Sequence, residues 1–243
     1  MPDYFLSDVH LRQDRPERAL RLARFVDGLG GEDRLFVVGD LCDFWMATRE
    51  LRREASRCPG LRSLAGYSAR GGRLTVLAGN HDVWMGDYYR RTLAATWVPG
   101  ELSVASHGLR VHLAHGHRLG ARSLWKAGME GRAFFRAFGL APSFLASRLE
   151  SRLERSNEAH READERRHLE LYRRFADTME GRCDLVVLGH VHRVHDDRPA
   201  RPRLIVLGGW HDRASYLRVD DCGVLLKEVA NPDHAPGGSL ARA

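Results

Sequence analysis

Five short motifs rich in histidine and acidic residues each follow an apolar run of the kind that forms a buried strand. In chain order the motifs are Asp8-Val9-His10, Gly39-Asp40, Gly79-Asn80-His81-Asp82, His115-Gly116-His117 and Gly189-His190-Val191-His192. The apolar runs that precede them are residues 4–6, 35–38, 74–77, 111–113 and 185–188. Loops at the carboxyl ends of strands are where α/β folds place their sites. The repeated arrangement therefore predicts that these polar side chains gather at one edge of a layered α/β domain.

Helical and strand-like patterns fill the sequence between the motifs. Apolar spacing predicts a helix over residues 15–29, a helical stretch over 49–69 interrupted at Pro59-Gly60, and a short helix over 87–97. A hairpin is expected from residues 102–105 and 109–114, turned at His107-Gly108, and further strands are expected at 203–207, 216–219 and 223–229.

One long segment breaks this alternation. Residues 119–180 carry no strand signal, and their charged second half has many opposite charges at helical neighbour spacing, so we expect a helical insertion that forms a lid over the site. Its first half contains a phenylalanine cluster, Phe134, Phe135, Phe138 and Phe144. We expect one domain over residues 1–230 and a disordered tail, rich in Pro and Gly, over 231–243.

Composition narrows the class of protein. The chain has 243 residues, of which 43% are hydrophobic and 29% charged, as in a soluble globular protein. The sequence has no run of the ~20 apolar residues that a membrane span needs. A strand begins almost at Met1, where a signal peptide would lie, so cytoplasmic residence is expected. The four cysteines lack CxxC spacing, which argues against a zinc knuckle and a disulfide framework.

The basic character of the chain comes almost entirely from arginine. The formal net charge is +6, and Lys126 and Lys227 are the lysines of the sequence. Arginine suits phosphate groups and anionic surfaces. No nucleic-acid-binding motif accompanies this charge, so we expect no nucleic-acid partner. An obligate protein partner is not evident either.

The residue types in the motifs match the needs of a two-metal site. Asp8 and His10 are two residues apart, so in an extended chain both face the same side. Asp40 could bridge two ions, and Asn80 offers an amide oxygen. The last two motifs offer imidazole nitrogens from His115, His190 and His192. Such a mixed oxygen and nitrogen set suits Mn, Fe or Zn better than Ca or Mg. Two such ions, ~3.5–4 Å apart, activate water near neutral pH and polarise a phosphoryl oxygen.

Taken together, the motifs resemble those of the calcineurin-like metallophosphoesterase superfamily. The resemblance implies an α/β fold, namely a four-layer α/β/β/α sandwich of two mixed sheets. It also implies the ligands of each ion: Asp8, His10, Asp40 and His192 for the first, and Asp40, Asn80, His115 and His190 for the second. His81 would lie beside the substrate, where it stabilises the transition state or protonates the leaving oxygen, and Asp82 would orient its ring.

A narrower resemblance comes from three further places, one of which is the position of the helical insertion after His115. Residues 39–45 (GDLCDFW) and 206–211 (VLGGWH) are similar to segments of UDP-2,3-diacylglucosamine diphosphatases, which act in lipid A synthesis. This resemblance implies two divalent ions, preferably Mn²⁺, a nucleotide-linked glycolipid as substrate, and an enzyme that rests peripherally on the cytoplasmic face of the inner membrane. The expected substrate contacts are Asn80, His81, Arg122, Ser156 and Asn157. Independently of the resemblance, clustered phenylalanines beside arginines are physically suited to acyl chains near an anionic membrane.

Two departures from that enzyme family leave other substrates open. The well-known members have GNRD and HGD where this chain has Gly79-Asn80-His81-Asp82 and His115-Gly116-His117. His81 thus replaces a phosphate-binding arginine, and His117 is a candidate contact of the substrate or of a metal ligand. The alternative is a metallophosphoesterase for another phosphodiester, a phosphoprotein or a dinucleotide. A metal-free binding scaffold is disfavoured because none of the seven expected ligands is missing.

Overall fold

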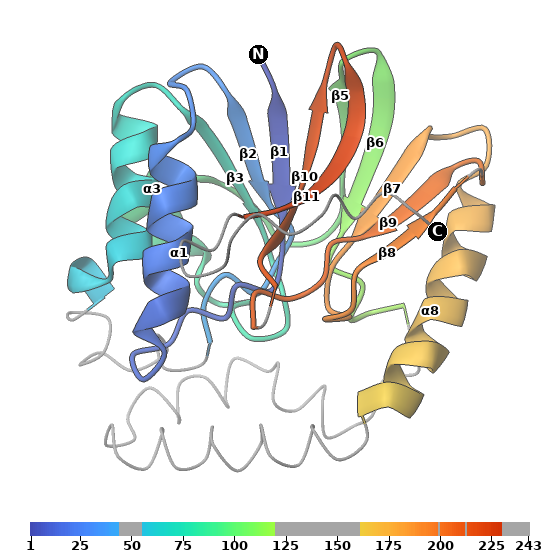
Figure 1. Ribbon diagram of the computed structural model, residues 1–243, viewed down its shortest axis with the longest axis horizontal. Coiled ribbons are helices and arrows are strands. Elements are labelled where there is room, and N and C mark those ends of the chain that lie inside the picture. Colours follow the sequence, from blue (N-terminus) through green and yellow to red (C-terminus); the bar gives the residue numbers. More distant parts are fainter. Residues whose placement is uncertain (44–54, 120–160, 199, 212, 230–243) are drawn as a thin grey trace.

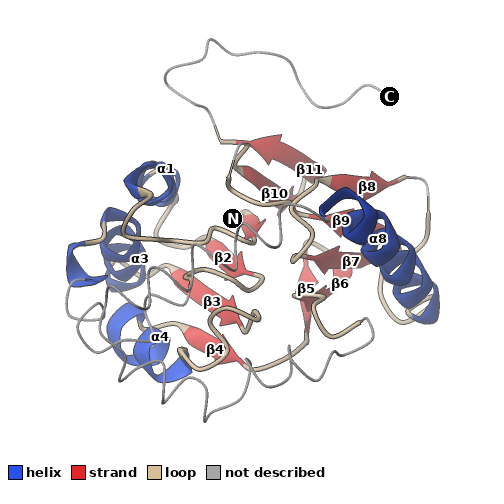
Figure 2. Cartoon of the chain, turned by 90° about the horizontal axis from the view of Figure 1, so that it is seen from below, coloured by secondary structure: helices blue, strands red, loops and turns tan. Residues whose placement is uncertain are grey.

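Two β-sheets pack face to face and carry helices on their outer sides (Figures 1 and 2). The computed structural model describes residues 1–43, 55–119, 161–198, 200–211 and 213–229. Both sheets contain parallel and antiparallel pairs, which confirms the expected α/β/β/α sandwich of two mixed sheets.

The first sheet has six strands in the order β11-β10-β1-β2-β3-β4. Its parallel part consists of β1 (Asp3–Leu6), β2 (Arg34–Val37), β3 (Arg73–Leu77) and β4 (Thr96–Val98). At the other side of β1, β10 (Ser215–Asp220) runs antiparallel to β1, and its outer neighbour β11 (Gly223–Glu228) runs antiparallel to β10. The helices on its outer side are α1 (Pro16–Asp27), α3 (Pro59–Ala69) and α4 (Gly86–Leu93). A short 3₁₀ turn, η2 (Ala55–Arg57), directly precedes α3.

The second sheet has five strands in the order β5-β6-β7-β9-β8. Its parallel centre consists of β6 (Leu109–Ala114), β7 (Leu185–Leu188) and β9 (Arg203–Val206). The antiparallel edges are β5 (Leu102–Ser106) and β8 (His195–Asp197). Helix α8 (Arg161–Thr178) covers the outer face of this sheet and packs Tyr172 and Ala176 against Val186 and Leu188.

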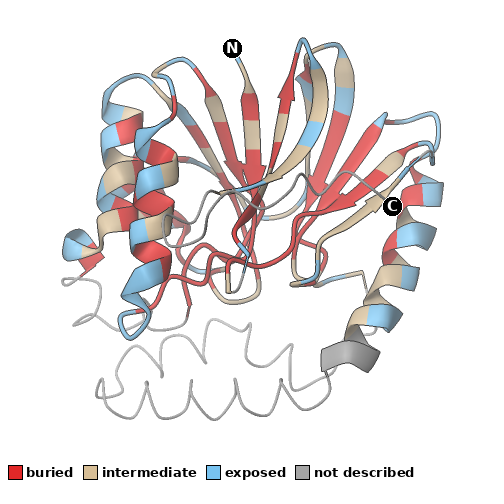
Figure 3. Cartoon of the chain, viewed as in Figure 1, coloured by how far each residue is buried: buried red, intermediate tan, exposed pale blue. Residues whose placement is uncertain are grey.

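Alternation along the strands creates two apolar layers around the first sheet. Leu35 and Val37 of β2 pack toward the helices, whereas Phe36 and Val38 face the second sheet. Between the sheets Phe36 stacks on Phe5, with ring centroids 4.8 Å apart. The central strands are buried along most of their length, whereas the edge strands β4, β8 and β11 are partly exposed (Figure 3). This packing fixes the two sheets relative to each other, and with them the loops at their ends.

Two sequence expectations differ from the structure. The helix expected over residues 87–97 ends at Leu93, because Ala94 takes a left-handed conformation (φ 50°) and Thr96–Val98 forms β4, whose Thr, Trp and Val favour strands. Pro59 does not interrupt a helix but begins one, since its fixed φ suits the first helical position.

The segment expected to form the lid is described only in its last part. Residues 161–178 are helical, as expected, and form the outer layer of the second sheet. Residues 120–160, with the phenylalanine cluster, lie outside the described residues, as do 44–54 and the tail over 231–243. Within the described part of the chain, no helix combines the length and apolar character that crossing a bilayer requires.

Candidate metal centre

The five motifs meet at one edge of the sandwich, because each leaves the carboxyl end of a parallel strand. Asp8 and His10 follow β1, Asp40 follows β2, and Asn80 follows β3. From the second sheet, His115 follows β6, and His190 and His192 follow β7. The register of β6 and β7 pairs Ala114 with Leu188, so the two histidine motifs begin side by side.

The backbone of these loops is unusually constrained. Six described residues other than glycine have a positive φ, and four of them belong to the motifs: Asp8 (52°), His10 (49°), Asp40 (51°) and His190 (66°). Side chains disfavour this region, so the surroundings must hold it. The amide of Asp8 donates to Gly39 O (3.2 Å) and that of His10 donates to Asp40 O (3.0 Å). The first two loops therefore fix each other.

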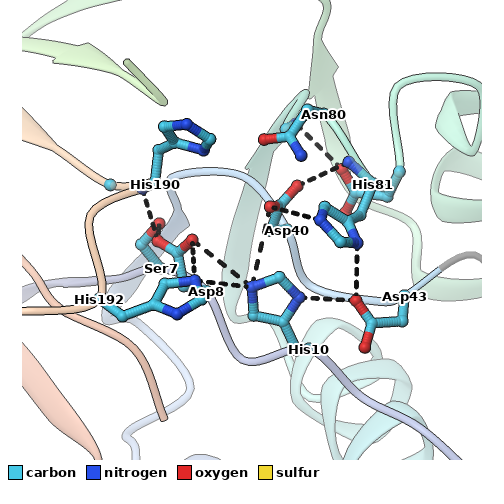
Figure 4. Close-up of polar contacts among 12 residues, drawn as sticks. Ser7, Asp8, His10, Asp40, Asp43, Asn80, His81, His190 and His192 are labelled. Atoms are coloured by element: carbon cyan, nitrogen blue, oxygen red, sulfur yellow. Dashed lines mark hydrogen bonds and ion pairs between the residues drawn. The ribbon is translucent and has the colours of Figure 1, made fainter. Parts of the chain in front are cut away.

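A first cluster joins Asp8, His10 and His192 (Figure 4). The Nε2 atoms of His10 and His192 are 3.2 Å apart, and they lie 3.6 and 3.5 Å from Asp8 Oδ1. The other oxygen, Asp8 Oδ2, accepts hydrogen bonds from Ser7 Oγ (2.5 Å) and the His190 amide (2.8 Å). Asp8 Oδ1 is buried and accepts no hydrogen bond from any residue that the structure describes.

A second cluster joins Asp40, Asn80, His115 and His190. His115 Nε2 lies 3.3 Å from Asp40 Oδ2 and 3.2 Å from Asn80 Oδ1. The other ring nitrogen of His115 donates to Val38 O (2.8 Å), which leaves Nε2 to face the cluster. Asp40 Oδ2 also lies 3.8 Å from His10 Nε2, so it stands between the two clusters.

The donor set fits a pair of divalent cations. The Nε2 atoms of His10 and His192 face each other beside Asp8 Oδ1, a buried oxygen that accepts no hydrogen bond from the described residues. A shared cation would satisfy this arrangement. Asp40 Oδ2 is placed to serve both clusters. Carboxylate, amide and imidazole donors together suit Mn, Fe or Zn. The groups present are therefore of the kind that binds such metal ions.

Opposite charges compensate one another inside the clusters. Burial alone would raise the pKa of Asp8 and of Asp40, but the nearby histidines, foremost His115, hold both below their usual value. Burial likewise disfavours charged His115, yet Asp40 and Asp8 raise its pKa to about 9. Burial and the neighbouring His115 lower the pKa of His190 well below its usual value. The carboxylates are thus ionised at neutral pH and ready to bind cations.

His81 lies beside the clusters and is paired with a different acid from the one expected. Its Nδ1 is 2.9 Å from Asp43 Oδ1, while its Nε2 faces Asp40 Oδ2 at 4.0 Å. The side chain is 24% exposed, more than the carboxylates around it. Burial would lower its pKa, but Asp40 and Asp43 raise it. The expectation that Asp82 orients this ring is corrected: Asp43 lies against it.

The Asp82 carboxylate is bonded to groups other than the His81 ring and ties the loops together. It accepts hydrogen bonds from the amides of Gly79 and Leu41 and from the Tyr89 hydroxyl, each at 2.9 Å. The chain turns after Gly79, so adjacent side chains diverge, and Asp82 is fully buried. Burial, then the nearby Asp40, raises its pKa to about 6.

Asp43 is the site residue that sequence reasoning left without a role. Its Oδ1 also lies 2.6 Å from His10 Nδ1. The signal was present, because this acid stands three residues after Asp40 in the GDLCDFW segment. His211 also went unassigned; its ring stacks on His192 with centroids 4.6 Å apart.

Of the remaining residues expected near the substrate, the structure describes His117. The His117 ring lies 5.2 Å from that of His115 and 6.2 Å from that of His190, so it borders the second cluster. Arg122, Ser156 and Asn157 lie outside the described residues.

Paired sheets that end in Asp and His clusters define a metal-dependent phosphoesterase. Residues 1–194 match the calcineurin-like phosphoesterase family, and the chain belongs to that family. It is therefore a metal-dependent hydrolase.

Three similar proteins share one name. The chain is 26% identical over 234 residues to UDP-2,3-diacylglucosamine hydrolase of Neisseria meningitidis serogroup A, which covers 93% of this chain and 97% of that protein. It is 29% identical over 250 residues to the protein of that name from Ralstonia nicotianae (93% and 92% covered). The protein of that name from Aeromonas salmonicida is 27% identical over 254 residues, with 98% of each chain covered.

Proposed function

We propose that this chain hydrolyses the pyrophosphate of UDP-2,3-diacylglucosamine to UMP and 2,3-diacylglucosamine 1-phosphate. Similarity to hydrolases of that name over more than nine-tenths of the chain supports the substrate. The observation that carries the chemistry is the pair of Asp and His clusters that meet at Asp40 Oδ2.

The two clusters would hold two divalent ions, for which we propose Mn²⁺. Asp8, His10 and His192 would bind the first, Asn80, His115 and His190 the second, and Asp40 both. When bound, such ions lower the pKa of water and polarise a phosphoryl oxygen. Asp43 would keep the proton of His10 on Nδ1, at 2.6 Å, so that Nε2 remains free to bind.

His81 would act on the substrate rather than on a metal ion. Contact with Asp43 through Nδ1 directs Nε2 toward the cluster edge, where a phosphate would bind. There it would stabilise charge on a phosphoryl oxygen or give its proton to the departing oxygen. In the overall step, water forms a bond to the α-phosphorus, the bridging P–O bond breaks, and the sugar 1-phosphate leaves with the electron pair.

Recognition of the lipid is proposed for the segment before α8. The phenylalanine cluster would receive acyl chains, and Arg122, Ser156 and Asn157 would contact phosphate or sugar. We place the enzyme peripherally on the cytoplasmic face of the inner membrane, where such a glycolipid would be reached. These assignments rest on the sequence and on the names of the relatives.

The test is hydrolysis of UDP-2,3-diacylglucosamine in detergent by Mn-loaded protein in ¹⁸O-labelled water. Mass spectrometry should find the label in UMP, because water attacks the α-phosphorus, and Asp40→Ala or His115→Ala should abolish the reaction. Cleavage of bis-p-nitrophenyl phosphate without cleavage of the glycolipid would reject the substrate and keep the chemistry. Truncating Phe134, Phe135 and Phe138 together to alanine should impair the glycolipid reaction far more than that of the small ester.

A further inference from the structure

One buried tyrosine of α8 touches both histidine loops of the second cluster. Tyr172 is fully buried, and its hydroxyl donates a hydrogen bond to Gly189 O (3.1 Å), in the residue directly before His190. The same hydroxyl end lies against Gly116, directly after His115. There a Cβ atom would overlap the Tyr172 hydroxyl and would lie 2.7 Å from Cζ.

The two loops are also tied to each other at this point. The amide of Gly189 donates to His115 O (3.2 Å). Gly116 has φ 98°, a conformation that glycine adopts without strain, so the loop can pass close to the ring. Tyr172 therefore contacts both loops, through Gly189 and Gly116, beside the bond that joins Gly189 to His115. These contacts together restrict the distance between His115 and His190.

The Tyr172 ring packs in an apolar cluster, so its hydroxyl is the group that a phenylalanine at this position would lack. Its neighbours in the packed cluster are apolar, among them Ala114, Leu188 and Val191. A phenylalanine would fill the same space but would leave Gly189 O without this donor. One turn earlier on α8, the His168 ring lies 5.4 Å from His190 and 6.3 Å from Tyr172, so two successive turns of the helix line the same loop.

We infer that Tyr172 is a positioning residue that fixes the spacing of His115 and His190 and so sets how tightly the second cluster holds its ion. The inference rests on the metal roles proposed above for these two histidines and is independent of the glycolipid. Tyr172 bonds to the backbone of one ligand loop and packs on the other, which makes it a support of the ligands rather than a catalytic group.

The experiment compares two variants that each lose one buried hydroxyl-to-carbonyl hydrogen bond. Tyr172→Phe loses the bond to Gly189 O. The matched control, Tyr67→Phe, loses the bond from a fully buried hydroxyl to Asp33 O, before β2 and therefore at the opposite end of that strand from Asp40. Metal-stripped proteins are titrated with Mn²⁺ by calorimetry, and electron paramagnetic resonance distinguishes a coupled ion pair from a single ion.

Tyr172→Phe should lower the affinity for one of two Mn²⁺ ions roughly 10-fold or more, the range for lost outer-sphere partners of metal ligands. The affinity for the other ion should not change. The coupled signal should give way to a single-ion signal at limiting Mn²⁺, whereas Tyr67→Phe should match wild type. Gly116→Ala, which crowds the intact hydroxyl, should have the same selective effect. Unchanged affinities in Tyr172→Phe, or equal weakening of both ions, would overturn the inference. Wild-type protein that binds two ions but spares the glycolipid would refute only the proposed substrate.

Discussion

Asp43 Oδ1 lies 2.6 Å from Nδ1 of His10, in a buried contact that joins the loop after β2 to the loop after β1. The same oxygen is 2.9 Å from His81 Nδ1. One carboxylate thus sets the tautomers of a proposed metal ligand and of a proposed substrate-binding histidine. Its loss should affect both metal binding and turnover.

Asp43→Asn should lower Mn²⁺ affinity roughly 10–100-fold, as for other lost partners of metal-bound histidines. At saturating Mn²⁺ the kcat should still fall, because His81 loses its charged partner. Metal titration and steady-state rates at saturating metal separate the two effects. Asp14→Asn is the matched control, since Asp14 is 61% exposed and pairs with Arg12. Full recovery of kcat with added Mn²⁺ would contradict the second role.

His81→Ala should slow turnover by about 10²–10⁴-fold, the usual contribution of a positioned acid or base. Metal content, measured by plasma emission, should stay near the wild-type value, because His81 is not among the proposed metal ligands. Loss of an ion from this variant would mean that His81 is a ligand.

Removal of metal should destabilise the fold, because the proposed ligands come from both sheets. Mn²⁺ at a hundred times its dissociation constant should add about 2.7 kcal/mol to the free energy of unfolding. For a chain of this length that corresponds to a rise in Tm of roughly 5–10 °C over chelator-treated protein, measured by calorimetry. Asp8→Ala should lose much of this rise, whereas Asp87→Ala, at a side chain 78% exposed, should keep it. An identical Tm with and without Mn²⁺ would argue against the centre.

Alkaline pH should destabilise the protein through its tyrosines. Burial raises the pKa of all six, to about 12 for Tyr67 and Tyr88. Because the fold favours the protonated phenols, their contribution to stability is complete below pH ~10, the pKa in the unfolded chain, and each is lost as pH rises through its raised pKa, about 12 for Tyr67 and Tyr88. Absorbance at 295 nm should show little phenolate in native protein at pH 10, in contrast to denatured protein. Half-ionised tyrosine at pH 10 with native circular dichroism would disprove this.

The sequence predicted the meeting of the five motifs at one edge better than it predicted the edge strands of the sheets. The runs before Asp8, Asp40, Asn80, His115 and His190 are apolar except for Thr75 and His112. Such runs mark central strands, and parallel central strands bring their ends together. The edge strands β4 and β8 have three residues each, and β8 reads His-Asp-Asp, without an apolar pattern. Its order comes from tertiary ion pairs, such as Asp196 with Arg203 at 2.8 Å, which periodicity does not reveal.

Asp43 and Tyr172 illustrate a second limit of sequence reasoning. Both act through contacts with residues distant in the chain, 33 positions for Asp43 with His10 and 17 for Tyr172 with Gly189. Tyr172 lies in no motif, and the position of Asp43 three residues after Asp40 does not show which histidines it contacts. Their roles follow only once the packing of the two sheets and of α8 is known.

Each cluster takes side chains from loops of both sheets, so metal binding depends on how the two sheets are placed against each other. Asp8, His10, Asp40 and Asn80 belong to one sheet, and His115, His190 and His192 to the other. A slight slip of one sheet across its neighbour would preserve every strand and every helix, yet separate the donors of each ion. Metal stoichiometry should therefore expose a misassembled preparation that circular dichroism would pass as native.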